Sequence, residues 1–274
     1  MTTDKTKRII SYSILIVLYA FMSVYVLRKV IISYLRNINK KRVDLRVYQV
    51  YSWLILFFSF AKIIGSLFII LEIQKNDDYD VFYSIANQFL LAAFFSITIS
   101  VANIRRSIYP ESIQNTKLRR FLIVLVIILN IVLLIVSLVL LLKVIKAYYI
   151  FIASLYFLCG FGLFLFTFFL LRTFKKFDLI DYIPGSKKLI FILFLITLLF
   201  FLRLIALLVV DFNDKINEKV NHIFDVAYYF IFEQIPVYLG FYFFAILPNK
   251  KERILEISLI KKNEKSNEME MNFD

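Results

Sequence analysis

The chain has 274 residues, of which 61% are hydrophobic, and it carries a formal net charge of +13 at pH 7. The apolar residues fall into blocks of about twenty, a pattern that excludes an ordinary soluble domain and predicts several membrane spans. Only five Gly and four Pro are present, and no alternating ten-residue pattern occurs. We therefore expect helical spans rather than a β-barrel.

Seven apolar stretches have the length required to cross the hydrocarbon core of a bilayer. In chain order they are Ile9–Leu27, Tyr51–Ile73, Val81–Ile104, Phe121–Leu142, Tyr148–Leu171, Leu189–Val210 and Ile223–Leu247. The predicted fold is an all-α membrane protein, a bundle of seven transmembrane helices within residues 1–251. Residues 252–274 are expected to form a cytosolic tail, with a short interfacial helix at Ile254–Ile260 before a disordered end.

Lys and Arg residues are distributed unequally between the two sides of the predicted bundle. The first, third and fifth loops and the tail hold 23 of them, and the opposite side holds 8. Because cytosolic loops carry the excess of Lys and Arg, we expect the N-terminus to face away from the cytosol and the tail to face into it. These cations lie at the membrane edge, which favours anionic lipids over nucleic acid as partners. The basic loops include Arg105, Arg106, Arg119, Arg120, Lys175 and Lys176.

Charged side chains inside the predicted spans are costly unless they find partners. Lys62, Arg203 and Glu233 all lie about 10–16 Å below the luminal edge, at a rise of about 1.5 Å per residue. Amide side chains of the third and fourth spans fall near the same depth. The sequence therefore predicts one intramembrane polar cluster, formed by Lys62, Asn87, Gln88, Asn130, Arg203 and Glu233.

Within this cluster, Glu233 is expected to pair with Arg203, because a short loop makes the last two spans neighbours. Lys62 joins them if the helices close into a ring. The two cations and one carboxylate leave one excess positive charge, which deprotonation of Lys62, the amide groups or a bound anion can balance. Two roles stay open, a clamp that fixes helix register and a site for a ligand or ion.

Pro236 lies three residues after Glu233, in the middle of the last predicted span. Proline has no backbone N–H and cannot continue the helical hydrogen-bond ladder. We expect it to free a backbone carbonyl near Phe232 and to kink the helix.

The sequence offers little for catalysis. Its single histidine, His222, cannot make a His-rich metal site, and so few glycines argue against a phosphate-binding loop. We expect no metal, no cofactor and no enzymatic activity. A retinal protein is excluded because Ile223–Leu247 contains no lysine for a Schiff base, and the single cysteine, Cys159, excludes an intramolecular disulfide.

The last span and the residues after it carry a pattern made of Tyr228, Tyr229, Glu233, Pro236, Leu247, Pro248, Lys250 and Lys251. This pattern resembles the TOM/THH family, seven-helix proteins named for plant host factors of tobamovirus multiplication. The segment Phe201-Leu202-Arg203, the later Phe212, and Lys62 in the second span give further points of resemblance. The resemblance implies an endomembrane protein, vacuolar in plants, that binds cytosolic partners such as an ARF-like small GTPase. It implies no known reaction, and the plasma membrane stays open as another location.

The chain departs from the family pattern at Val237, at Ala245-Ile246 and at Val101-Ala102-Asn103. The expected function is a membrane scaffold that recruits cytosolic partners, such as a small GTPase or trafficking or replication machinery. A ligand-sensing receptor of the G-protein-coupled type stays open as an alternative. It agrees with seven helices and an outward N-terminus, but the third span ends without an acidic-Arg-Tyr sequence and no Asn stands before Pro236. A transporter that uses the intramembrane charges is a third possibility, although no inverted repeat is visible.

Overall fold

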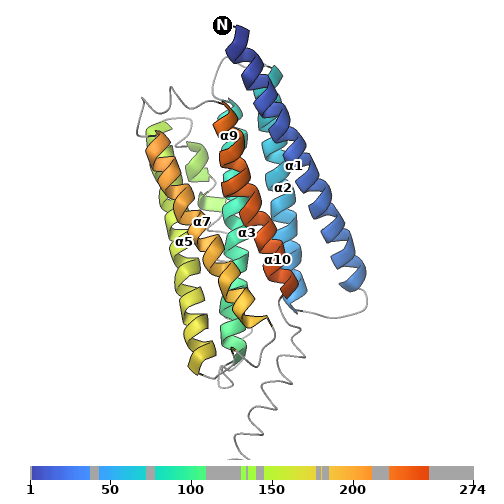
Figure 1. Ribbon diagram of the computed structural model, residues 1–274, viewed down its shortest axis with the longest axis vertical. Helices are drawn as coiled ribbons and strands as arrows, with labels where there is room; N and C mark the ends of the chain where they lie inside the picture. The colour runs from blue at the N-terminus through green and yellow to red at the C-terminus, as the bar shows by residue number, and fades with distance from the viewer. Residues whose placement is uncertain are drawn as a thin grey trace, which may run out of the picture.

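The structure is a computed structural model, and it describes residues 2–37, 43–71, 78–108, 131–133, 135–139, 145–176, 180, 185–211 and 222–246. Every described residue except Gly185 lies in a helix, so the prediction of an all-α fold is confirmed for this part of the chain. Figure 1 shows the long helices side by side, with the N-terminus at one end of the bundle and the end of the last helix at the other.

The elements follow one another without strands in the described ranges. In chain order they are α1 (Thr2–Asn37), α2 (Val43–Leu71), α3 (Asp78–Ile108), α5 (Ile145–Lys176), α7 (Ser186–Asp211), α9 (His222–Tyr229), the π-helical segment η1 (Phe230–Gln234) and α10 (Ile235–Ile246). The last three form one continuous rod, which corresponds to the last predicted span.

Six described helical stretches are long and apolar enough to cross a membrane, and they identify an integral membrane protein. These stretches are Thr6–Tyr34, Val47–Leu71, Val81–Arg105, Ile150–Lys176, Ser186–Ala206 and Val226–Ile246. They correspond to six of the seven predicted spans.

The other predicted span, Phe121–Leu142, is described only at residues 131–133 and 135–139, which are helical. In Figure 1, α3 and α5 run in the same direction, so the chain returns to the upper end of the bundle between them. A fourth crossing would make that return, and the count of seven helices stays a prediction. The predicted tail, residues 252–274, lies outside the described residues.

The helices extend beyond the apolar stretches that reveal them in the sequence. With 36 residues, α1 is about 54 Å long at 1.5 Å per residue, whereas the hydrocarbon core is about 30 Å thick. Its predicted span, Ile9–Leu27, was shorter because hydropathy marks the apolar part alone. Backbone hydrogen bonding continues through the polar residues at both ends.

The helices are arranged as a closed ring. Neighbours in this ring are α1 and α2, α2 and α3, α3 and α5, and α5 and α7. The last rod closes the ring, since η1 and α10 contact α7 while α9 contacts α1. This arrangement brings the middle of the last rod into contact with side chains of α1, α2 and α7.

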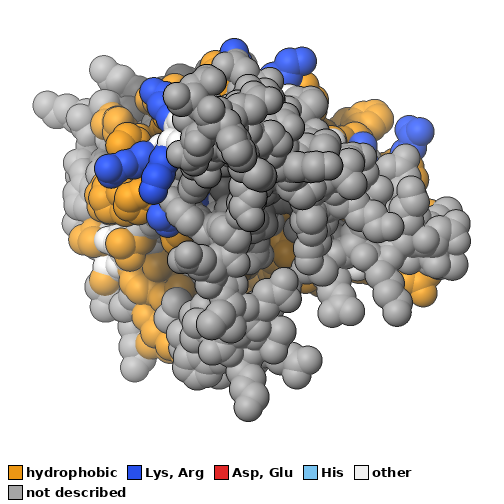
Figure 2. All heavy atoms as spheres, turned by 90° about the horizontal axis from the view of Figure 1, so that it is seen from below, with side chains coloured by type: hydrophobic (Ala, Val, Ile, Leu, Met, Phe, Trp, Pro, Cys, Tyr) orange, Lys and Arg blue, Asp and Glu red, His pale blue; other side chains and the backbone are white. Residues whose placement is uncertain are grey.

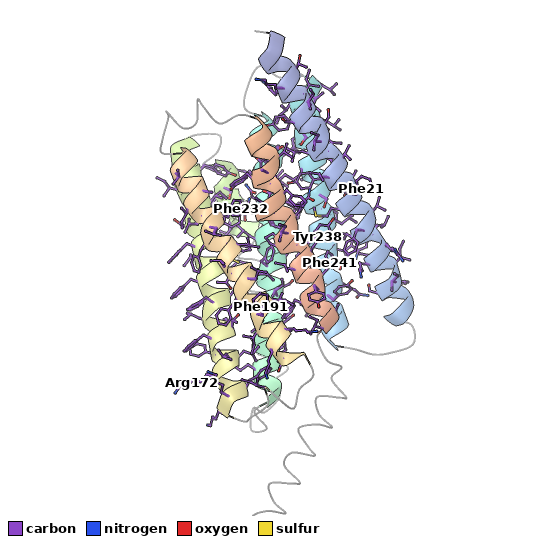
Figure 3. All side chains as sticks on the ribbon, in the orientation of Figure 1. Phe21, Arg172, Phe191, Phe232, Tyr238 and Phe241 are labelled. Carbon is purple, nitrogen blue, oxygen red and sulfur yellow. The ribbon has the colours of Figure 1, made fainter. Side chains whose placement is uncertain are left out.

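One face of each helix is buried and the other is apolar and exposed. On α1, the fully buried Leu15, Tyr19, Met22 and Val26 follow one another at spacings of three or four residues, whereas Phe21 is 70% exposed. Figure 3 shows Phe21 on the outer side of α1, away from the other helices. Exposed aromatic and aliphatic side chains of this kind are compatible with lipid, because acyl chains are as apolar as they are.

The last rod contains one π-helical turn. The N–H of Ile235 donates to the carbonyl of Phe230, five residues earlier, instead of four as in an α-helix. Pro236 follows immediately. The expected irregularity at this proline is therefore a π-helical turn before it, which leaves both Glu233 and Gln234 buried.

A glycine at position 185 allows the chain to turn into α7. Its φ of +83° is a left-handed conformation that glycine adopts without steric penalty. The carbonyl of Gly185 accepts from the N–H of Leu189 at 2.8 Å, which begins the helix. A Cβ at this position would lie 3.0 Å from Ile246 Cγ2, so the start of α7 lies beside the end of α10.

A second glycine, Gly240, permits close contact between α10 and α2. The hydroxyl of Tyr51 donates to the carbonyl of Val237 at 2.9 Å. A Cβ at position 240 would lie 2.1 Å from Tyr51 Oη and 2.7 Å from Tyr51 Cζ, distances at which something must move. The fully buried Tyr51 ring therefore requires a residue without a side chain at position 240.

We predict that Gly240→Ala lowers the free energy of unfolding by about 2 kcal/mol, because overpacking forces Tyr51 from its hydrogen bond. The measurement is thermal unfolding in detergent. The matched control is Gly162→Ala on α5, where a Cβ would have no atom within 4 Å. That variant should be neutral or stabilising because Ala favours helix over Gly. Equal losses in the two variants would show that the contact with Tyr51 is not the cause.

Candidate functional site

The centre of the bundle holds a buried carboxylate that pairs with two cations. Glu233 lies in η1 and is fully buried. Its Oε1 atom is 2.9 Å from Lys62 Nζ of α2 and 2.7 Å from Arg203 Nη2 of α7. The structure thus brings together the three charged residues that the sequence placed at one depth.

The second oxygen of the same carboxylate is engaged by α1. Tyr19 Oη donates to Glu233 Oε2 at 2.5 Å. Tyr19 is fully buried and packs edge-on against Phe58 of α2 at a centroid distance of 5.7 Å. Three helices therefore donate to one carboxylate, which provides the hydrogen-bond partners that a charged group requires in an apolar surrounding.

The guanidinium of Arg203 extends the cluster to α3 and α5. Its Nη2 atom donates to Asn87 Oδ1 at 3.1 Å, and Tyr156 Oη donates to the same oxygen at 3.2 Å. The centre of the guanidinium also lies 4.3 Å from the centroid of the Tyr156 ring, a cation–π contact.

Arg203 also binds the backbone of the π-helical segment. In an α-helix the carbonyl of Phe232 would accept from the N–H of residue 236, which is a proline here and has none. Arg203 Nη1 donates to this carbonyl at 3.3 Å. The carbonyl that Pro236 was expected to free therefore has a side-chain partner, in agreement with the tolerance of irregular backbone where protein covers it.

Lys62 is surrounded by aromatic rings as well as by the carboxylate. Its Nζ atom lies 4.3 Å from the centroid of Tyr83, 4.2 Å from that of Tyr229 and 5.8 Å from that of Phe58. Desolvated contacts of this kind contribute up to about 2 kcal/mol each. They stabilise the charged ammonium, an effect that the sequence did not reveal.

Two further amide residues, Gln88 and Asn130, are predicted for the cluster. Gln88 Nε2 donates to Ser137 Oγ at 2.6 Å, which links α3 to the helical stretch 135–139. Successive residues on a helix point about 100° apart, so Gln88 and its neighbour Asn87 face different partners at one depth. Gln88 is predicted for the polar cluster, and its hydrogen bond goes to Ser137 and not to the three charged residues. Asn130 lies outside the described residues.

Sequence reasoning missed three tyrosines of the site, which are Tyr19, Tyr83 and Tyr156. The chain has 17 Tyr, and nothing in the local sequence marks those that contact charges. For Tyr19 the only signal was its place on the apolar face of α1, which predicts burial without a partner.

The structure describes some residues of the family pattern and not others. Tyr228 and Tyr229 end α9, with ring centroids 5.4 Å apart, and Tyr228 also contacts the Phe232 ring at 5.2 Å. Leu247 and Pro248 lie outside the described residues. Among the predicted basic residues, Arg105 is partly buried and Lys175 and Lys176 are exposed. The side chain of Arg106, and Arg119 and Arg120 as a whole, are outside the described part.

The arrangement pairs one carboxylate with two cations at the centre of the bundle. Within the described ranges no group of three or more His, Cys, Asp or Glu is positioned to hold a metal ion. The carboxylate of Glu233 is saturated with donors on Oε1 and is covered on all sides. Its donors come from three helices, α1, α2 and α7.

No family model, curated protein or solved structure matches this chain. The resemblance to the TOM/THH family therefore stays a prediction from the residues of the last two spans.

We predict that Glu233 and Arg203 are energetically coupled in a double-mutant cycle of Glu233→Gln and Arg203→Leu. Each single change should cost about 3 kcal/mol, because the surviving buried charge loses a partner. The double variant should cost clearly less than the sum of the two. Thermal unfolding in detergent provides the measurement.

The control cycle combines Glu233→Gln with Lys188→Leu, which removes an exposed cation from the same helix as Arg203. Its two effects should add, since these side chains are not in contact. Additivity in the Arg203 cycle as well would mean that the ion pair does not contribute to stability.

Proposed function

We propose that this protein is a member of the TOM/THH family that acts as a membrane scaffold. In this proposal it resides in an internal membrane and recruits an acidic cytosolic protein, such as an ARF-like small GTPase, to its basic end. The observation that carries the proposal is a set of exposed cations held by rigid helices at one end of the bundle.

These cations lie where α5 ends and α7 begins. They are Arg172, Lys175, Lys176, Lys187 and Lys188, and all five are exposed. Figure 3 shows Arg172 at the lower end of α5, and Figure 2 looks onto that end, where Lys and Arg side chains lie among hydrophobic ones. Arg105 of α3 adds a further charge nearby, with its guanidinium 5.0 Å from the Phe169 ring.

Physical reasons favour an acidic partner and an anionic membrane surface for this end. Complementary charge speeds association and selects partners, and each Lys or Arg near an anionic membrane contributes about 1 kcal/mol. A bundle whose helices are tied at mid-depth by Glu233 holds these cations in fixed positions. Both attractions act on the same face, so a protein bound there is also held close to the lipid.

The buried charges favour a transporter as the second candidate. Lys62 and Arg203 both pair with Glu233 inside the bundle, and intramembrane charges often mark ion pathways. Ion flux through liposomes that contain the purified protein would favour this function. Ligand-dependent nucleotide exchange on a G protein would instead favour a receptor.

We predict that the end bearing Lys175 and Lys188 faces the cytosol and the N-terminus faces the lumen or the outside, because 23 Lys and Arg lie on one side and 8 on the other. Tags at the two termini in sealed vesicles test this orientation. Protease added from the cytosolic side should remove the C-terminal tag and spare the N-terminal one. The reverse pattern would contradict both the orientation and the recruitment proposal.

We predict that replacing Lys175 and Lys176 with Gln reduces recruitment of the cytosolic partner by roughly tenfold, since two near-surface cations are lost. Proximity labelling from a tag on the C-terminal tail identifies the partner, and binding is then measured at increasing salt. Attraction should weaken with salt because the screening length is about 8 Å at physiological ionic strength. The variant should melt at the same temperature as the natural protein.

The matched control replaces Lys5 and Lys7 with Gln. These residues lie at the start of α1, at the opposite end of the bundle, so the same change of charge should leave binding unchanged. Replacing Arg119 and Arg120 tests the third loop in the same way. If labelling enriches no cytosolic protein over an unrelated seven-helix protein, the scaffold function is wrong and a transporter or receptor takes its place.

A further inference from the structure

The buried cluster holds more positive charge than its described partners neutralise. Lys62 and Arg203 both pair with the single carboxylate of Glu233, and their side chains are only 1% and 3% exposed. Burying an ion costs several kcal/mol even after the protein relaxes. The rings of Tyr83, Tyr229 and Tyr156 offset a part of this cost, at about 0.5–2 kcal/mol per contact. They do not supply a negative charge.

Two acceptor oxygens of the cluster are fully engaged, whereas Glu233 Oε2 accepts from Tyr19 alone. Glu233 Oε1 accepts from Lys62 and Arg203, and Asn87 Oδ1 accepts from Arg203 and Tyr156. Each of these oxygens has two lone pairs, so neither has room for another donor.

Buried donors nevertheless remain beside the cluster. Arg203 Nε, Gln234 Nε2 and Ser84 Oγ have no hydrogen-bond partner among the described residues. All three residues are at least 97% buried. An unpaired buried donor costs about 1–3 kcal/mol, so a guanidinium N–H left unpaired beside the ion pairs indicates a missing acceptor.

These donors lie near the depth of the ion pairs, although adjacent residues such as Glu233 and Gln234 point in different directions. Arg203 Nε is part of the guanidinium that contacts Glu233. Gln234 follows Glu233 in η1. Ser84 precedes Asn87 by one turn on α3, and residues three apart lie on the same helix face.

We propose that a small monovalent anion of about the size of chloride binds inside the bundle beside Arg203. The excess of one positive charge determines the valence, and the unpaired donors supply its hydrogen bonds. Complete burial of the surrounding side chains determines the size, because a phosphate or carboxylate on a larger molecule would have to displace them. This site is independent of partner recruitment at the basic end, so either proposal can fail without the other.

The experiment is a halide titration of the purified full-length protein in detergent. The protein is first kept in sodium gluconate, whose monovalent anion is too large for the site. Gluconate is then replaced by chloride or bromide at constant ionic strength. Chloride and bromide should raise the unfolding temperature in a saturable way, by roughly 2–4 °C at ten times the midpoint concentration. Gluconate gives the baseline.

Two substitutions separate the site from a general salt effect. Lys62→Gln removes the excess charge and should weaken halide binding by at least about tenfold. Lys188→Gln removes a charge of the same sign from an exposed position on α7 and should leave the halide response unchanged. Ser84→Ala keeps every ion pair and removes one donor, so it should weaken binding by a few-fold without unfolding the bundle.

A direct measurement of chloride binding by NMR tests the proposal even if Lys62→Gln does not fold. Line broadening of the chloride NMR signal by the natural protein, reversed by bromide, should appear with the same midpoint as the thermal shift. An unfolding temperature equal in gluconate and chloride, or no displaceable broadening, would overturn the proposal. An equal halide response in Lys62→Gln or Ser84→Ala would place the anion elsewhere.

Discussion

The bundle depends on one carboxylate. Glu233 receives hydrogen bonds from Tyr19 of α1, Lys62 of α2 and Arg203 of α7, so three helices are fixed to the last rod at a single depth. Arg203 carries the connection on to Asn87 of α3. Lipid offers no substitute partner for any of these groups, whereas water would do so in a soluble protein. Rotation or sliding of one helix therefore breaks contacts on several others, and the basic end is held in place as a consequence.

The geometry of this centre depends on an irregular backbone. An unbroken α-helix through Phe230–Gln234 would turn Glu233 and Gln234 toward other directions around the helix axis. The carbonyl of Phe232 is available to Arg203 because Pro236 has no N–H to donate to it. The proline at 236 and the π-helical turn before it create both features together. Tyr51, bound to the carbonyl of Val237 next to Gly240, supports the rod just beyond the proline. Side chains from neighbouring helices thus stabilise a segment that would be unfavourable alone.

The level of a residue along its helix was predictable from the sequence, whereas the direction in which its side chain points around the helix axis was not. A fixed rise per residue placed Lys62, Arg203 and Glu233 in one layer, and the cost of buried charge predicted that they meet. Gln88 occupies the same layer and yet bonds Ser137, because its angle around α3 depends on packing with other helices. The π-helical turn also depends on tertiary contacts, so the sequence indicated a disruption at Pro236 without its form. Tyr19 was indistinguishable from other tyrosines on apolar faces.

The order in which Lys62, Arg203 and Glu233 follow one another along the chain has a consequence for biosynthesis. Lys62 and Arg203 emerge from the ribosome before the one described carboxylate that pairs with them. Until the last rod arrives, both cations must remain at the translocation machinery, reach toward a membrane surface, or draw water into the bilayer. Insertion of the earlier helices is therefore provisional, and quality control that detects unpaired intramembrane charge would sense whether the helix that bears Glu233 has been added.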